Sequence, residues 1–176
     1  MGFANIFKEI LLQPSDFFKR VSSEKNFSDP GIFALICSLI PGTILMREKV
    51  TWGALPFFFA GFLFVFITRL FIDSAILHGL FKMFGGEAVY QKSLQILSYS
   101  YAAYLFVTIP ILAIEFEIIP VDFSLVFTLY GVYLITRGGQ LIHNLNFGKS
   151  AFASILWESW YLVTSFILIT LLGIPL

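Results

Sequence analysis

Charged side chains are scarce in this sequence, since Lys, Arg, Asp and Glu make up only 12% of its 176 residues. Soluble proteins carry about 25%, because a surface in contact with water needs these side chains. Hydrophobic residues make up 58% of the chain, and 22 residues are Phe. The medium around most of the chain is therefore expected to be lipid, and a soluble domain is excluded.

An excess of charge of one sign is lacking as well, because 11 basic residues balance 11 acidic ones. This balance indicates neither a nucleic-acid-binding surface nor a polybasic membrane patch, and we expect no nucleic-acid partner. The single cysteine, Cys37, excludes an internal disulfide and a cysteine-based metal site.

Motifs of catalysis are also lacking. The chain has no Gly-rich phosphate loop, no His-Glu-x-x-His and no nucleophile elbow. His143 has no second histidine at ligand spacing, so we interpret it as a side chain that snorkels to the interface. We expect no enzyme, no metal and no cofactor.

Apolar stretches after Pro30 are what the sequence does contain, and they predict an all-α integral membrane bundle of five transmembrane helices. Most of them reach the roughly 20 residues that a helix needs to cross the hydrocarbon. They lie near residues 31–46, 54–82, 94–116, 121–145 and 150–173. Their connections are short, so residues 31–176 are predicted to form one five-helix transmembrane domain.

Residues 1–30 are predicted to be a cytoplasmic or interfacial segment with two short amphipathic helices. Residues 3–12 place their apolar side chains on one stripe, as expected for a helix on the membrane surface. After Pro14, Phe17, Phe18 and Val21 would dip into the interface while Lys19 and Arg20 face phosphates. Packing of these apolar side chains against the other helices is an equally good interpretation.

Lysine and arginine collect on one side of the predicted spans, which sets the orientation. The outer segments hold only Arg47 and Lys49. The inner segments hold Lys8, Lys19, Arg20, Lys25, Lys82, Lys92 and Lys149. This bias predicts a multi-pass protein of a prokaryotic cytoplasmic membrane, with the N-terminus in the cytoplasm and the C-terminus outside.

Polar side chains inside the predicted spans form the candidate functional site. A charge at the bilayer centre costs roughly 2.5 to 3.5 kcal/mol on insertion scales unless it finds a partner. Arg69 and Asp73 lie four residues apart and are natural ion partners. One face of the span near 121–145 is polar for four turns. The candidate intramembrane network comprises Arg69, Asp73, Tyr130, Tyr133, Arg137, Gln140, His143, Asn144 and Glu158.

The charges of this network lie at similar predicted depths and balance one another. We hypothesise that Arg137 pairs with Asp73 or Glu158. His78 lies roughly 140° around its helix from Asp73, which favours pairing with Ser74 or snorkelling. Buried ion pairs can fix the register of membrane helices, whereas a proton, ion or lipid headgroup pathway is the functional alternative.

Several short motifs occur in an order that resembles the Yip (Ypt-interacting protein) domain family in its short prokaryotic form. They are Gln13-Pro14-Ser15-Asp16-Phe17-Phe18, Phe84-Gly85-Gly86-Glu87, Lys92-Ser93-Leu94 and Asn146-Phe147-Gly148-Lys149-Ser150-Ala151. The resemblance covers nearly the whole chain. Eukaryotic members are associated with vesicle trafficking and Rab-type GTPases, but their Asp-Leu-Tyr-Gly-Pro stretch is missing here, so the resemblance implies no GTPase-binding residue.

The sequence thus favours a non-enzymatic protein that organises membranes or acts as a scaffold for partners. The alternative is a small permease, ion pathway or lipid mover that uses the polar network. The lipid bilayer is the expected partner. A protein partner and a homo-oligomer stay open at this level.

Overall fold

The computed structural model describes residues 2–23, 28–46, 55–115 and 124–171, and every element in these ranges is an α-helix. The helices are α1 (Phe3–Leu12), α2 (Pro14–Ser23), α3 (Ser28–Met46), α4 (Leu55–Met83), α5 (Tyr90–Glu115), α6 (Ser124–Ile142) and α7 (Phe147–Leu171). The prediction of an all-α protein is confirmed. The orientation rested partly on Lys25, Arg47 and Lys49, which lie outside the described residues.

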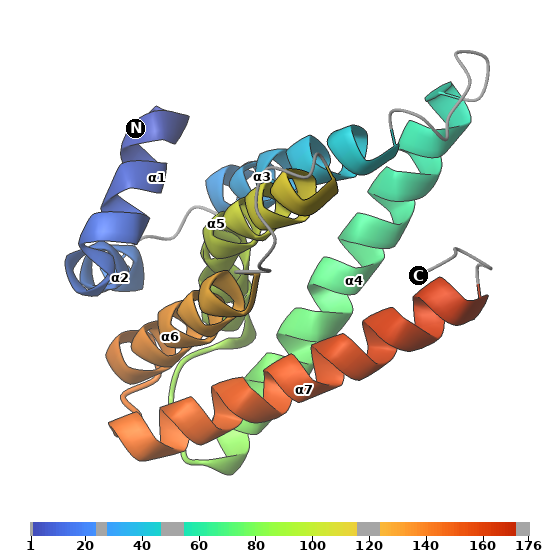
Figure 1. Ribbon diagram of the computed structural model, residues 1–176. Coiled ribbons are helices and arrows are strands. Elements are labelled where there is room, and N and C mark those ends of the chain that lie inside the picture. The colour runs from blue at the N-terminus through green and yellow to red at the C-terminus, as the bar shows by residue number, and fades with distance from the viewer. Residues whose placement is uncertain (1, 24–27, 47–54, 116–123, 172–176) are drawn as a thin grey trace.

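The central helix of the bundle is α5, which contacts α3, α4, α6 and both N-terminal helices. The next helix, α6, packs against α5 and α7, and α7 in turn contacts α4. In Figure 1, α1 and α2 lie at one edge of the bundle, whereas α4 and α7 form the other. The amphipathic N-terminal helices and the long apolar helices therefore cover different parts of α5 and α6.

Two helices are long and apolar enough to cross a bilayer within the described part of the chain. These segments are Phe59–Met83 of α4 and Leu125–Ile142 of α6. The first half of α5 contains the polar residues Ser93, Gln95 and Ser98, which lower the mean hydropathy of this helix. All three side chains are buried against neighbouring helices, so they do not face lipid. Each predicted span corresponds to a helix, but five crossings of the membrane stay a prediction.

The two N-terminal helices pack against the bundle through their apolar stripes. The most buried of these side chains, each at most 1% exposed, are Ile10, Phe17, Phe18 and Val21. The Phe17 ring lies edge-on to Tyr99 of α5, with 4.7 Å between the ring centroids. Packing against other helices is therefore what the structure shows. Insertion of Phe17, Phe18 and Val21 into the interface is wrong, because protein already covers them.

Charged residues of α1 and α2 also bond within the protein. Arg20 donates a hydrogen bond of 2.7 Å to the Glu9 carboxylate, which ties α2 to α1. The ammonium group of Lys19 lies 3.7 Å from the carboxylate of Asp16 on the outer face of α2. The expectation that Arg20 faces phosphates is thus wrong, because its guanidinium is held by Glu9.

The closest approach of α6 to its neighbours occurs at Gly138 and Gly139. A β-carbon on Gly138 would lie 2.7 Å from the Ile96 side chain of α5. One on Gly139 would lie 2.8 Å from the Phe81 ring of α4 and would also collide with the Ser150 hydroxyl of α7. Since α6 runs without interruption to Ile142, these glycines serve close helix packing.

The turn after α4 requires glycine for conformational and steric reasons. Gly85 has φ of 93°, a left-handed conformation that glycine adopts without strain. The Gly86 N–H donates a hydrogen bond of 2.8 Å to the Phe81 carbonyl, which closes the end of α4. The turn then places Glu87 beside the end of α6, where its N–H donates to the carbonyl of His143 at 3.2 Å.

Replacement of Gly139 by Ala tests the close packing of α6. We expect Gly139→Ala to lower the free energy of unfolding by about 1 to 3 kcal/mol, because the methyl group pushes Phe81 of α4 and Ser150 of α7 away from α6. The matched control is Gly79→Ala in α4, where a β-carbon meets nothing within 4 Å. Denaturant titration in detergent micelles measures both variants, and equal losses of stability would contradict the assignment.

Candidate functional site

The polar residues predicted inside the spans do not form one network, but separate into three clusters. The α4–α7 cluster contains Arg69 and Asp73, and the α6–α2 cluster contains Arg137 and Gln140. The histidine cluster lies where α4 and α6 end and α5 begins, and it contains His143. Each cluster joins helices that are distant in sequence.

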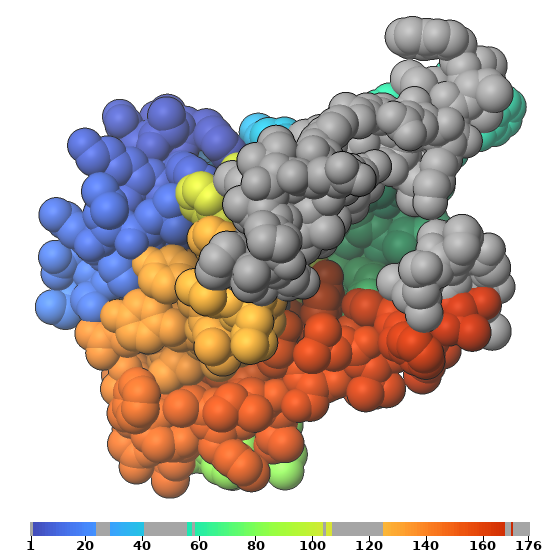
Figure 2. All heavy atoms as spheres, viewed as in Figure 1, coloured from blue at the N-terminus to red at the C-terminus, as the bar shows by residue number. Residues whose placement is uncertain are grey.

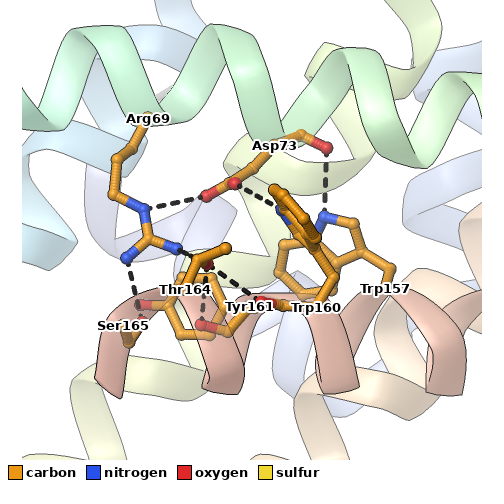
Figure 3. A network of polar contacts seen from close by, with 7 residues as sticks. All are labelled: Arg69, Asp73, Trp157, Trp160, Tyr161, Thr164 and Ser165. Carbon is orange, nitrogen blue, oxygen red and sulfur yellow. Dashed lines mark hydrogen bonds and ion pairs between the residues drawn. The ribbon is translucent and has the colours of Figure 1, made fainter. Parts of the chain in front are cut away.

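The α4–α7 cluster is built around the guanidinium of Arg69 (Figure 3). Its Nε lies 3.3 Å from Oδ2 of Asp73, so the ion pair expected from their spacing is present. Its two terminal nitrogens donate to the hydroxyls of Ser165 and Thr164, both at 2.9 Å. The guanidinium carbon also lies 4.6 Å from the centroid of the Tyr161 ring, a cation–π contact.

Asp73 completes the α4–α7 cluster from within α4. It is 2% exposed, and its Oδ1 accepts a hydrogen bond of 3.4 Å from Nε1 of Trp160. Nε1 of Trp157 donates to the main-chain carbonyl of Asp73 at 3.0 Å. Charge, hydroxyl and indole groups therefore hold α4 against α7.

Sequence reasoning missed the part that α7 plays in this cluster. The partners repeat at intervals of three and four residues along one face of α7, namely Trp157, Trp160, Tyr161, Thr164 and Ser165. This amphipathic stripe was a signal that could have found them. Glu158 lies next to Trp157 and is 7% exposed.

The α6–α2 cluster lies where the polar face of α6 meets the junction of α1 and α2. Arg137 donates from Nε to the Ser15 hydroxyl at 3.2 Å and from Nη2 to the same oxygen. Its Nη1 donates to Oε1 of Gln140 at 2.8 Å. The Tyr130 hydroxyl donates at 2.7 Å to the carbonyl of Leu11, at the end of α1 where carbonyls lack helical partners.

The hypothesis that Arg137 pairs with Asp73 or Glu158 is wrong. Within the described residues, the guanidinium of Arg137 bonds only to the neutral groups of Ser15 and Gln140. The physical reason is rotation: α6 turns this face toward α2, whereas Asp73 lies at the contact between α4 and α7. The similar depths predicted from the sequence did not bring these charges together.

The histidine cluster joins both histidines of the chain through one serine. The Ser93 hydroxyl lies 3.1 Å from Nδ1 of His78 and 2.9 Å from Nε2 of His143. Pairing of His78 with Ser74 and snorkelling of His143 are both wrong, because α5 supplies Ser93 and His143 is 0% exposed. At the surface beside them, Asn144 donates a 2.8 Å hydrogen bond to Glu87.

His143 follows the last residue of α6 and is electrostatically constrained. Burial lowers its pKa from the ordinary 6.5 to about 4, and the positive charge of His78 and Lys82 acts in the same direction. Its imidazole is therefore neutral at pH 7. In the part of the chain that the structure describes, no group of three or more His, Cys, Asp or Glu side chains could hold a metal ion.

A groove of about 430 Å³ opens along α6 beside Tyr130 and Tyr133. Its walls are Leu11 of α1, Phe106 of α5 and residues of α6 between Val126 and Tyr133. Tyr133, predicted to join the polar network, is 39% exposed here. The groove is thus an apolar surface feature, and it includes Tyr130 and Tyr133 from the predicted polar face of α6.

The Arg69–Asp73 pair can be tested by a double-mutant cycle. We expect Arg69→Met to lower the free energy of unfolding by about 3 to 5 kcal/mol, because it leaves a buried carboxylate without its cation. Adding Asp73→Leu should restore most of the loss, since both charges are then absent. Unfolding in detergent measures the cycle, and a double variant as unstable as Arg69→Met would refute the pairing.

The buried imidazole of His143 predicts a dependence of stability on pH. Protonation favours the unfolded chain, so stability should be full above pH 6.5 and fall as the pH drops toward 4. Each unit of pKa shift corresponds to about 1.4 kcal/mol. Unfolding of the wild type and His143→Gln at pH 7.5 and 5 measures the effect, and an equal pH dependence in both would disprove it.

Comparison with known proteins identifies the family of this chain. No curated protein and no solved structure matches it. The Yip1 domain family matches residues 8–173, a range that includes all three polar clusters. The two long apolar segments, in α4 and α6, agree with contact with a lipid bilayer. The chain is therefore a membrane protein that belongs to the Yip1 domain family.

Proposed function

We propose that this chain is a non-enzymatic protein that organises the membrane of a prokaryotic cell or acts as a scaffold for partners there. In this proposal α3 to α7 each cross the cytoplasmic membrane, with the N-terminus inside and the C-terminus outside. Residues 1–30 form a cytoplasmic or interfacial segment, and residues 31–176 form the transmembrane domain. The polar clusters act as links between helices.

The observation that carries the proposal is that the charge of Arg69 is balanced by a carboxylate within the chain. Its guanidinium bonds to Asp73, Thr164 and Ser165 and lies over the ring of Tyr161. A group that receives a transported ion or substrate must be free to exchange partners. Arg69 instead is paired with a buried carboxylate and bonded to two hydroxyls of α7, which favours a role in helix packing.

The outer surfaces of α4 and α7 support contact with lipid or with apolar partners. Large side chains there are widely exposed, including Phe57 at 81%, Phe64 at 72% and Phe166 at 58%. Exposed apolar surface of this extent is typical of membrane or protein contact surfaces. A scaffold uses such faces directly, without any change in its interior.

The second candidate function is a small permease, ion pathway or lipid mover, and Arg137 favours it. This cation has only neutral hydrogen-bond partners in the described part of the chain. A charge without a carboxylate partner could receive an anion in passing. The two candidates differ in whether the polar face of α6 conducts.

Flux through liposomes distinguishes the two functions. We expect ion leak and lipid scrambling with the wild-type protein to equal those of protein-free liposomes, because the interior polar groups are bonded to one another. Gln140→Leu, which removes the amide beside Arg137, should leave these rates unchanged. Flux by the wild type that falls with Gln140→Leu, but not with the exposed control Gln91→Leu, would establish the mover instead.

A further inference from the structure

The charge of Arg137 is not balanced by any carboxylate among the described residues. Its acceptors are a hydroxyl and an amide. The described acids of α1 and α2 are used elsewhere, since Glu9 pairs with Arg20 and Asp16 with Lys19. A guanidinium has five N–H donors. Three of them, one on each nitrogen, donate to Ser15 and Gln140. Donors and a full positive charge therefore remain for an anionic ligand.

The groove beside α6 lies on the same helix face as this charge, toward the start of the helix. Tyr133, Tyr130 and Val126 precede Arg137 by four, seven and eleven residues, which places all of them on one stripe. The groove surface is apolar and accessible, with Val126 and Leu129 each 59% exposed. Its volume of about 430 Å³ is comparable with ligand sites of roughly 300 to 1,000 Å³.

One wall unites the charged end and the apolar groove. Leu11, at the end of α1, lines the groove, and Ser15, four residues later in α2, holds Arg137. Figure 2 shows α1 and α2 in blue directly beside α6 in orange. A ligand that follows this seam meets a guanidinium at one end and apolar side chains at the other.

The order of these groups is that of a phospholipid. If the N-terminus is cytoplasmic, Arg137 lies toward the inner headgroups and Val126 toward the other leaflet. We propose that Arg137 and the groove bind one anionic phospholipid of the cytoplasmic leaflet. Its phosphate accepts hydrogen bonds from Arg137, and its acyl chain lies against Tyr133 and Leu129. This site rests on the membrane placement given under the proposed function.

Lipid titration of the full chain in detergent, followed by native mass spectrometry, tests the site. Phosphatidylglycerol should bind about tenfold more tightly than phosphatidylcholine, and Arg137→Gln should abolish this difference. Arg137→Lys keeps the charge and should keep the preference in part. The control Lys149→Gln removes a positive charge from an exposed position and should bind phosphatidylglycerol as the wild type does.

A second pair of measurements separates a lipid from a free phosphate. Leu129→Trp fills the groove, leaves Arg137 in place and should weaken phosphatidylglycerol binding about tenfold. Inorganic phosphate should not displace the lipid, because it lacks an acyl chain. Displacement by inorganic phosphate, together with wild-type lipid binding by Leu129→Trp, would overturn the lipid assignment in favour of a simple anion site.

Equal binding of phosphatidylglycerol by the wild type and Arg137→Gln would overturn the site altogether, as would equal affinity for the two lipids. Thermal unfolding of Arg137→Gln and Leu129→Trp shows whether each variant is folded. These failures are distinct from failure of the membrane-organising function, which only flux through the wild type in liposomes would contradict.

Discussion

Three consecutive residues of α6 hold this bundle together, because between them they contact four other helices. Arg137 bonds to α2, Gly138 packs on α5, and Gly139 packs on both α4 and α7. Lipid chains are as apolar as leucine, so helices in a bilayer gain little from hydrophobic burial against one another. Close approach at small residues and hydrogen bonds between helices then decide the arrangement, and residues 137–139 supply both.

The polar clusters extend the same principle to the rest of the chain. Arg69 joins α4 to Thr164 and Ser165 of α7, and Ser93 of α5 joins the two histidines. Each of these groups would be costly if left alone in a low-dielectric medium. Their bonds to one another therefore favour one arrangement of helices over others. In a Yip1 family member without catalytic motifs, such internal bonding leaves the outer surface as the part available to lipids and partners.

The candidate site could be predicted from the sequence only where partners lie on one helix. The Arg69–Asp73 pair follows from a spacing of four residues, and the polar face of α6 follows from helical periodicity. The partner of Arg137 could not be predicted from depth, because depth says nothing about the rotation of a helix around its axis. Likewise, the apolar stripes of α1 and α2, which include Ile10 and Phe17, fit contact with a membrane surface and contact with protein equally well. Only the position of α5 shows that these stripes contact protein.

The sequence by itself determined the lipid environment, the helical class, the approximate bounds of the five long helices and the ion pair within α4. These properties depend on composition and on local backbone hydrogen bonds, which repeat every 3.6 residues along an α-helix. The tertiary structure alone decided that α2 covers Arg137, that α7 holds Arg69 and that Ser93 lies between His78 and His143. Such contacts depend on how side chains from distant segments fit together, and a periodic pattern does not encode which faces meet.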